Sequence, residues 1–551
     1  MPTSEFAKKA THGYAWNYLY KLSEFGLTHL YGIIVVRAFG PTVSAPYAVF
    51  LSLAAILSMV GAFGVDGVLL RYIQRVSSNE STHRPEQFDK IETLSLPHFL
   101  TTLLAFRLLI VTGIALLAAL IFLVLPSYAP SLRDSLGSLS EFAPHLIVFL
   151  FAQGISAFST FALTGLLETK KVFLSSIIAR AGLLLTGAVL TLSGLLSLQL
   201  AISIYTGSFC VSALLMYASL HKHIKALGIK QEHLRLSTII TTITSFLKRP
   251  KHLWAFLATP LLLYGITTWG NDLLSTVLGK QPDILMMRAI LGENSSQIGF
   301  YYSAAQLLQI TEYIFLFGFG GTLISIFSKL SHQDEADGPG YSLLNKARRE
   351  VAGFQSVVLI PLCCFVFLFT DKIIHILYGA SFSDASVMVQ YGIVSLIISV
   401  GVFGGGMQIT SLVSVGKERV VFKNRLFWGI VNLGINVLLI YKFGALGAII
   451  GTQYCNTAAC ASESYFSRKY IGKAIDLPST IRLFILSAFA SIIPYYLVGL
   501  LGGSDIIQFI VAAAINVVLI IVFYRQFKVP ELQIFLKRLE NLSPKLANRL
   551  R

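Results

Sequence analysis

The stretch VVRAFGPTVSAPYAVF, residues 35–50, decides the fold. An apolar run ends with Arg37 and Ala38, Gly40 and a short polar turn follow, and Tyr47 opens a second apolar run. Each run extends to about 20 residues, which is enough for a helix to cross roughly 30 Å of hydrocarbon. The stretch therefore predicts a tight turn between two membrane-spanning helices.

The composition extends this interpretation to the whole chain. Of 551 residues, 55% are hydrophobic and only 13% are charged, about half the charge of a soluble protein. Apolar windows of similar length recur from end to end, without the ten-residue alternation of a membrane β-barrel. We predict an all-α polytopic membrane protein.

About fourteen transmembrane helices are expected, and the segment 282–291 is expected to be a short outer excursion between two of them. The predicted spans are 13–36, 47–69, 99–125, 143–166, 172–193, 198–220, 253–279, 298–328, 352–378, 386–414, 422–441, 444–466, 481–501 and 504–524.

The distribution of lysine and arginine predicts the orientation. With the N-terminus inside, 34 of the 43 basic residues fall in cytoplasmic segments and 6 in outer ones. This excess is the positive-inside pattern, so we expect both termini in the cytoplasm. The formal charge of +16 then reflects orientation and attraction to anionic lipid, and we expect no nucleic acid as a partner.

The two halves of the chain resemble each other. MMRAILGENSSQIGFYYSA, residues 286–304, repeats the Arg-Ala, glycine, polar turn and aromatic residue of the opening stretch. A basic cluster before Val-Phe occurs in both ETKKVFLSSIIARAGLLL and GKERVVFKNRLFWGIVNL. Six spans separate the members of each pair, so the halves share one orientation, as in transporters with parallel repeats. We predict two six-helix bundles related by a pseudo-twofold axis along the membrane normal, with two additional C-terminal helices.

The repeat predicts five regions. They are an N-terminal bundle (1–225), a basic cytoplasmic linker (226–252), a C-terminal bundle (253–470), two additional helices (471–525) and a cytoplasmic amphipathic tail (526–551).

The chain resembles the polysaccharide (lipid-linked oligosaccharide) flippases, Wzx-like, of the MATE/MOP superfamily. The resemblance runs over about residues 10–470 and rests on segments such as RAFGPTVSAPYAVFLSL, GAFGVDGVLLRYI, TPLLLYGITTWGNDLLSTVLGKQPDILMMRAILGENSSQIGFYYSAAQL and LYGASFSDASVMVQYG. The turn PTVSAPY departs from the family's acidic-polar stretch. The resemblance implies translocation of an undecaprenyl-diphosphate-linked oligosaccharide from the inner to the outer leaflet of a bacterial plasma membrane by alternating access.

The same resemblance implies a transporter and not an enzyme, which fits the lack of a phosphate loop or a hydrolase motif in the sequence. We expect no cofactor, although Na⁺ or H⁺ is a possible coupling ion. Expected partners are the glycolipid, the bilayer and envelope-assembly proteins such as a glycan polymerase. Two rival hypotheses are a cation-coupled multidrug exporter of the same superfamily and a non-transporting membrane scaffold.

A polar stripe crosses the first span. Asn17, Lys21, Glu24 and Thr28 are spaced by three or four residues, as are Tyr14 and Tyr31 beyond them, so all lie on one helical face. A charge at the membrane centre costs roughly 2.5–3.5 kcal/mol, so the stripe is predicted to line a water-accessible cavity and bind substrate. The alternative is a structural Lys21–Glu24 ion pair.

Arg107 and Arg180 lie in the third and fifth spans at about the depth of Lys21. We predict that these three residues bind the diphosphate. The alternatives for the arginines are snorkelling of their side chains to the inner headgroups and pairing between helices.

Acidic residues are more frequent in the spans of the second half. Asp272 and Glu312 are predicted to bind a coupling Na⁺ or H⁺, because a buried carboxyl can titrate; the alternative is a structural salt bridge. Asn432, Asn436 and Asn456 are expected to hydrogen-bond between helices. No metal site is expected.

Overall fold

The computed structural model describes residues 4–78, 95–128, 136–227, 236–249, 251, 260–316, 323, 326–331, 333–334, 341–500 and 504–529. These residues form helices and turns and contain no strand, which confirms the all-α fold. Most of the predicted tail, from residue 530 onward, lies outside the described residues.

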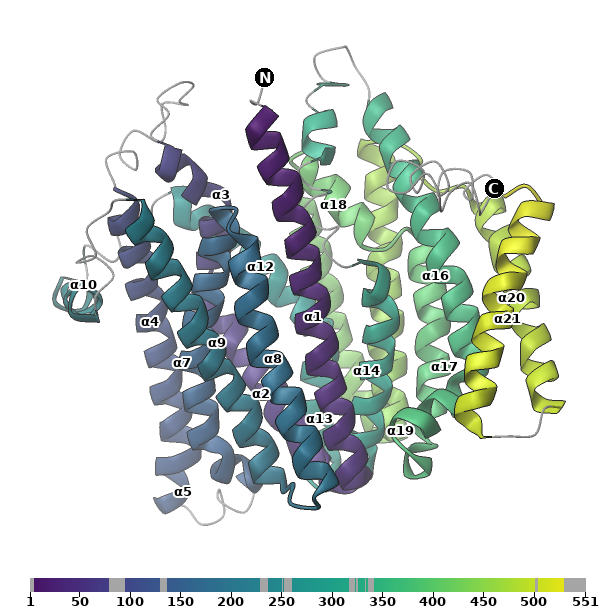
Figure 1. Cartoon of the computed structure of the whole chain (residues 1–551), viewed down its shortest axis with the longest axis horizontal. Coiled ribbons are helices and arrows are strands. Elements are labelled where there is room, and N and C mark those ends of the chain that lie inside the picture. The colour runs from purple at the N-terminus through teal and green to yellow at the C-terminus, as the bar shows by residue number, and fades with distance from the viewer. Residues whose placement is uncertain are drawn as a thin grey trace. The chain divides into compact units, whose positions relative to one another are not determined.

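The larger helices follow the predicted order of spans (Figure 1). Their bounds are α1 (Ser4–Val43), α2 (Ala45–Ala62), α3 (Val65–Ser78), α4 (Leu96–Ala119), α5 (Leu125–Tyr128), α7 (Ser138–Gly165), α8 (Thr169–Leu192), α9 (Leu198–Ala226), α10 (Leu236–Lys248), α12 (Pro260–Val277), α13 (Lys280–Leu291), α14 (Ser296–Leu316), α16 (Ser342–Leu377), α17 (Ala385–Leu396), α18 (Gly406–Ser414), α19 (Glu418–Tyr470), α20 (Leu477–Leu500) and α21 (Asp505–Gln526).

Within the described residues, ten helical segments are long and apolar enough to cross a membrane. The longest, α19, has 53 residues. A straight helix of that length would extend about 80 Å, more than twice the hydrocarbon thickness. Instead α19 turns back at Gly444, where φ is 58°, and Asn424 on the first arm donates a hydrogen bond to the carbonyl of Ala459 on the second. It therefore provides two crossings.

The helices α1, α12 and α14 carry more polar residues and are not among the ten segments. They occupy the positions of three predicted spans. With them, and with α19 counted twice, the described helices account for the fourteen expected crossings.

The chain forms two compact units. The first comprises Met1–Ala38 and Pro46–Thr276. Within it, α7, α8 and α9 run side by side (Figure 1), and α3 and α4 pack against α7. Buried apolar side chains from several of these helices, including Leu69, Leu100 and Phe158, form its core.

The second unit comprises Phe39–Ala45 and Val277–Arg551. Here α16 packs against α17 and α20, and α13, α14 and α17 pack against α19. The last two helices, α20 and α21, form a hairpin beside α16 (Figure 1). The region boundaries predicted at residues 225, 252, 470 and 525 stay predictions.

The two Arg-Ala motifs adopt the same local conformation. Gly40 has φ 72° and ψ 176°, and Gly292 has φ 89° and ψ 161°. Side chains rarely adopt this region of backbone space, so glycine is needed where each helix turns. The aromatic residues that follow, Tyr47 and Tyr301, are each 1% exposed. This local agreement supports the internal repeat.

Residues 282–291, predicted as a short outer excursion, belong to the helix α13, which follows α12 after two residues and packs against α14 and α19. Asp283, Ile284 and Met287 are buried in these contacts. The segment is therefore a packed helix, and its place on the outer side stays a prediction.

Arg348, just before the predicted span 352–378, lies inside the second unit and is 1% exposed. Its guanidinium donates hydrogen bonds to Ser411 Oγ, Gln408 Oε1, Ser467 Oγ, Asn345 Oδ1 and the carbonyl of Gly472. These neutral acceptors join α16 to α18 and to the end of α19. Arg348 is therefore a structural residue of the second unit.

We expect Gly265→Ala to destabilise the first unit. A Cβ at Gly265, on α12, would lie 2.6 Å from the carbonyl oxygen of Gly64, between α2 and α3. Overpacking of this kind costs about 1–3 kcal/mol, so the thermal unfolding midpoint in detergent should fall. Gly207→Ala on α9 is the control, because a Cβ there meets no atom within 4 Å. Equal midpoints for the two variants would contradict this close approach of α12 to the α2–α3 turn.

Candidate functional site

The polar stripe of α1 is partly accessible and partly sealed. The side chains of Lys21 and Glu24 are 45% and 32% exposed. Asn17 and Thr28 are half-buried, and the hydroxyl oxygen of Thr28 is buried without a hydrogen-bond partner among the described residues. Tyr31 is fully buried and donates a hydrogen bond of 2.7 Å to the carbonyl of Ala201 on α9. The accessible part of the stripe is therefore centred on the charged pair.

Lys21 and Glu24 form the ion pair that was the alternative to a ligand site. Lys21 Nζ lies 3.7 Å from Glu24 Oε2. The other carboxylate oxygen, Glu24 Oε1, lies 3.8 Å from Nη2 of Arg180 on α8. Glu24 thus holds two cations from different helices, and neither contact has the short distance of a strong charge-assisted hydrogen bond.

Arg107 pairs with an acidic residue that the sequence analysis did not assign. Its Nη1 donates a hydrogen bond to Asp66 Oδ1, from α4 to the start of α3. Asp66 also interacts electrostatically with Lys21. We call Lys21, Glu24, Asp66, Arg107 and Arg180 the basic cluster. It brings together the three cations predicted from their common depth.

Neither arginine of the basic cluster snorkels to a headgroup. Arg107 and Arg180 are each 2% exposed. Arg180 donates a hydrogen bond of 2.9 Å to Ser208 Oγ on α9, and its guanidinium carbon lies 3.8 Å from the centre of the Phe209 ring. Both residues therefore pair between helices, and their predicted role in binding the diphosphate stays a prediction.

The basic cluster keeps an unmet capacity to bind an anion. Its three cations and two carboxylates leave one positive charge in excess. The Nε atoms of Arg107 and Arg180 are buried and lack a hydrogen-bond partner among the described residues. A buried donor without an acceptor costs about 1–3 kcal/mol. An anion that enters beside the half-exposed Lys21 would relieve this cost.

The predicted coupling residues lie in different units and different surroundings. Asp272, on α12 in the first unit, is exposed. Glu312, on α14 in the second unit, is half-buried and interacts electrostatically with Arg425. The structure does not bring the two together in one unit, and their roles in coupling stay predictions.

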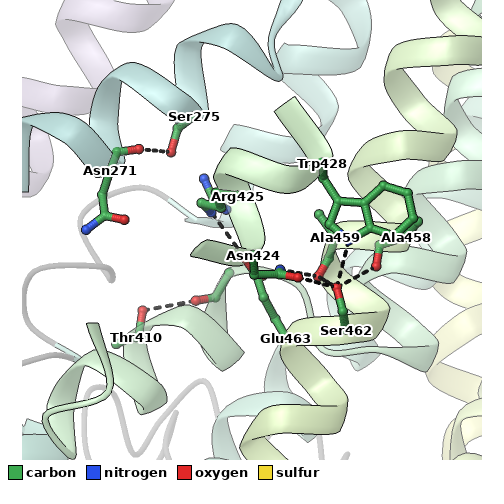
Figure 2. A network of polar contacts seen from close by, with 11 residues as sticks. Asn271, Ser275, Thr410, Asn424, Arg425, Trp428, Ala458, Ala459, Ser462 and Glu463 are labelled. Atoms are coloured by element: carbon green, nitrogen blue, oxygen red, sulfur yellow. Dashed lines mark hydrogen bonds and ion pairs between the residues drawn. The ribbon is translucent and has the colours of Figure 1, made fainter. Parts of the chain in front are cut away.

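Arg425 also pairs with Glu463 across the α19 hairpin. Its Nε donates a hydrogen bond of 3.1 Å to Glu463 Oε1, and the side chain of Glu463 is fully buried. Figure 2 shows this contact beside a second one, in which Ser462 Oγ accepts from Trp428 Nε1 and donates to Asn424 Oδ1. We call Glu312, Arg425 and Glu463 the acidic triad. The sequence analysis singled out Glu312 but not Arg425 or Glu463, because the contact between those two joins positions 38 residues apart in the chain.

A second buried carboxylate, Asp283 on α13, is surrounded by neutral donors. Asn436 Nδ2 donates to its Oδ1 at 2.7 Å, Thr452 Oγ1 donates to Oδ2 at 2.7 Å, and Tyr301 also donates to Oδ2. Asn432 Oδ1 lies 3.2 Å from Thr452 Oγ1. These five residues form the Asp283 network, in which no salt bridge to Asp283 occurs among the described residues.

Asn432 and Asn436 do hydrogen-bond between helices as predicted, since both contact α12 or α13 from α19. The carbonyl oxygen of Asn436 nevertheless remains buried without a partner in the described part of the chain. The Asp283 network therefore contains one unpaired oxygen acceptor as well as helix contacts. Within the described residues no group of three or more His, Cys, Asp or Glu side chains is arranged to hold a metal ion.

No protein-family model and no curated protein matches the sequence. Solved structures match over nearly the whole chain. One is the lipid II flippase MurJ in an inward closed conformation, with a TM-score of 0.59, 15% sequence identity, and coverage of 95% of this chain and 99% of that one.

Two further structures belong to the MOP superfamily. An inward-facing multidrug resistance MATE transporter matches with a TM-score of 0.55 and 13% identity, covering 82% of this chain and 94% of that one. A MOP superfamily transporter from Pyrococcus furiosus, described as having a binding pocket of reverse polarity, matches with a TM-score of 0.51 and 12% identity, covering 83% and 95%. At these identities the likeness shows the fold alone. The chain is a multi-pass membrane protein with the fold of MOP superfamily transporters.

Proposed function

We propose that the protein moves a diphosphate-linked lipid oligosaccharide, with an undecaprenyl-type carrier, from the inner to the outer leaflet of a bacterial plasma membrane. The observation that carries this proposal is the basic cluster, whose two buried arginines retain unpaired donors beside a half-exposed lysine. A multidrug exporter of cations would need the opposite charge at this place. The similarity to a lipid II flippase supports a lipid-linked substrate.

The recognition step follows from the contacts of Glu24. In the free protein Glu24 holds Lys21 and Arg180 at 3.7 and 3.8 Å. A diphosphate carries more negative charge than one carboxylate and forms stronger charge-assisted hydrogen bonds. It would therefore displace Glu24 from Lys21 and accept from the arginine Nε–H groups, while Asp66 continues to hold Arg107.

The membrane potential favours the proposed direction. With the inside negative, each negative charge that moves outward gains about 2.3 kcal/mol per 100 mV. A diphosphate headgroup carries about two such charges, so potential alone supplies part of the driving force. Alternating access by the two units is the corresponding mechanism.

Three carboxylates, Asp283, Asp272 and Glu312, are the candidate sites for the proposed coupling ion. The Asp283 network fits a small cation, because it combines a buried carboxylate with amide and hydroxyl oxygens, the ligands that hard cations prefer. One of those oxygens, Asn436 Oδ1, is unused. Asp272 and Glu312 remain the candidates predicted from the sequence, and Asp272 is the weaker of the two because it is exposed whereas Glu312 is half-buried.

We expect Asn17→Cys to react with small water-soluble thiol reagents, because Asn17 is half-buried on the accessible part of the stripe. Thr206→Cys, at a buried position of α9, should stay inert. Both are made in a chain whose five cysteines have been replaced, and labelling is measured by mass shift. Equal labelling of both sites, or of neither, would contradict an accessible stripe on α1.

We expect Lys21→Ala to reduce transport of the lipid-linked glycan by roughly 10- to 100-fold, which corresponds to a lost charged hydrogen bond of about 1.5–3 kcal/mol. Lys21→Arg should keep part of the activity, since the charge persists while its geometry changes. Transport is measured in proteoliposomes at equal protein content. Normal transport by Lys21→Ala, or full recovery when Glu24→Ala is added to it, would show that the pair is only structural.

We expect Asp283→Asn to change the dependence of transport on Na⁺ or pH, because it removes the charge and keeps most of the hydrogen bonds. Glu312→Gln and Asp272→Asn test the two residues predicted from the sequence. Asp371→Asn, at an exposed position of α16 outside these sites, is the control. Wild-type ion dependence in a variant would remove that residue from the coupling mechanism.

A further inference from the structure

The acidic triad holds more negative charge than its surroundings neutralise. Arg425 is its one cation, while Glu312 and Glu463 are both carboxylates, so full ionisation leaves a net charge of −1. Glu463 is fully buried and Arg425 is 14% exposed. An uncompensated charge in such surroundings costs several kcal/mol. The cost disappears when one carboxylate takes up a proton.

The hydrogen bonding of Glu463 points to the same conclusion. Its Oε1 accepts from Arg425 Nε at 3.1 Å (Figure 2). Its Oε2 is buried and forms no hydrogen bond of regular geometry among the described residues, and the Asn424 side chain is the neutral polar group beside the carboxylate. An ionised carboxylate is an acceptor at both oxygens, so a buried oxygen without a well-formed hydrogen bond is a place where a proton can bind.

Within the part of the chain that the structure describes, no identified neighbour of the triad carboxylates other than Arg425 is a cation. Tyr313 on α14, Cys363 on α16 and Cys460 on α19 are described titratable groups that interact electrostatically with these carboxylates. All three are neutral in their protonated forms. A bound metal cation fits less well than a proton, because the guanidinium of Arg425, which contacts Glu463 and interacts electrostatically with Glu312, would repel it.

We infer that the acidic triad is a proton-binding site, in which Glu312 and Glu463 share Arg425 and hold one exchangeable proton between them. The proton comes from water and forms an O–H bond with one carboxylate oxygen; on release that bond breaks and the proton returns to water. Glu312 is half-buried and is the more exposed of the two carboxylates, while Glu463 is fully buried. The inference deepens the proposed ion coupling and rests on it only for the link to transport.

The site also has a mechanical consequence within the second unit. Glu463 and Arg425 lie on opposite arms of α19, and Glu312 lies on α14, which packs against α19. When the proton is on Glu463, Arg425 pairs best with Glu312 and the attraction weakens between the arms. When the proton is on Glu312, Arg425 pairs with Glu463 and the hairpin is held closed. Proton occupancy thus selects which helix Arg425 holds.

The direct test is infrared spectroscopy of the purified full-length protein across a pH titration, where a protonated carboxyl gives a C=O band that shifts in D₂O. We expect the wild type to lose this band at high pH. Glu312→Gln and Glu463→Gln should each lack the triad's contribution at all pH values, because the remaining carboxylate then pairs alone with Arg425 and stays ionised. Glutamine preserves the side-chain shape, and either variant alone suffices if the other fails to fold.

Two controls make the result specific. Glu141→Gln, an exposed glutamate of α7, should leave the band unchanged. Arg425→Gln should increase it, because both carboxyls then lose their cation. A band that neither triad variant alters, or its absence from the wild type, would overturn the inference. The infrared measurement needs no glycolipid, so its result does not depend on whether the proposed transport activity is correct. If the protein does transport the glycolipid, Glu463→Gln should also reduce the dependence of the transport rate on pH.

Discussion

A charge inside the hydrocarbon layer must find a partner, and the rest of this structure depends on that constraint. Water is absent there, so each ionised group needs an opposite charge or hydrogen-bond donors from another helix. Arg107 forms an ion pair with Asp66, Arg180 with Glu24, and Arg425 with Glu463. Each of these contacts joins separate helices or arms, so the charges help to position the helices.

The buried charged clusters of the two units carry net charges of opposite sign. The basic cluster of the first unit has one cation in excess and unpaired arginine donors. The acidic triad and the Asp283 network of the second unit have carboxylates in excess. We interpret the imbalance as a division of tasks, because an excess of cations suits an anionic headgroup and an excess of carboxylates suits a proton or small cation. A membrane scaffold would have no need of either imbalance.

Much of the candidate site was predictable, but only to the level of helix faces and depths. The three-and-four spacing placed Lys21 and Glu24 on one face of α1, and both are accessible there. Depth along the spans placed Arg107 and Arg180 near them, yet it did not distinguish pairing from snorkelling. The helical periodicity of the sequence predicts which face of its own helix a side chain occupies. It does not predict the partner, which lies on another helix distant in the sequence.

The sequence by itself determined the all-helical class, the order of the crossings and the repeated turns at Gly40 and Gly292, since apolar length and backbone freedom are local properties of the chain. Only the tertiary structure decided which charges are paired and which acceptors remain unused. Arg348 and Arg425 show why: both lie near the start of a predicted span, and both bond inside the second unit to partners more than 30 residues distant in the chain. Pair energies in a low dielectric depend on distances of a few ångströms between helices, which no local pattern specifies.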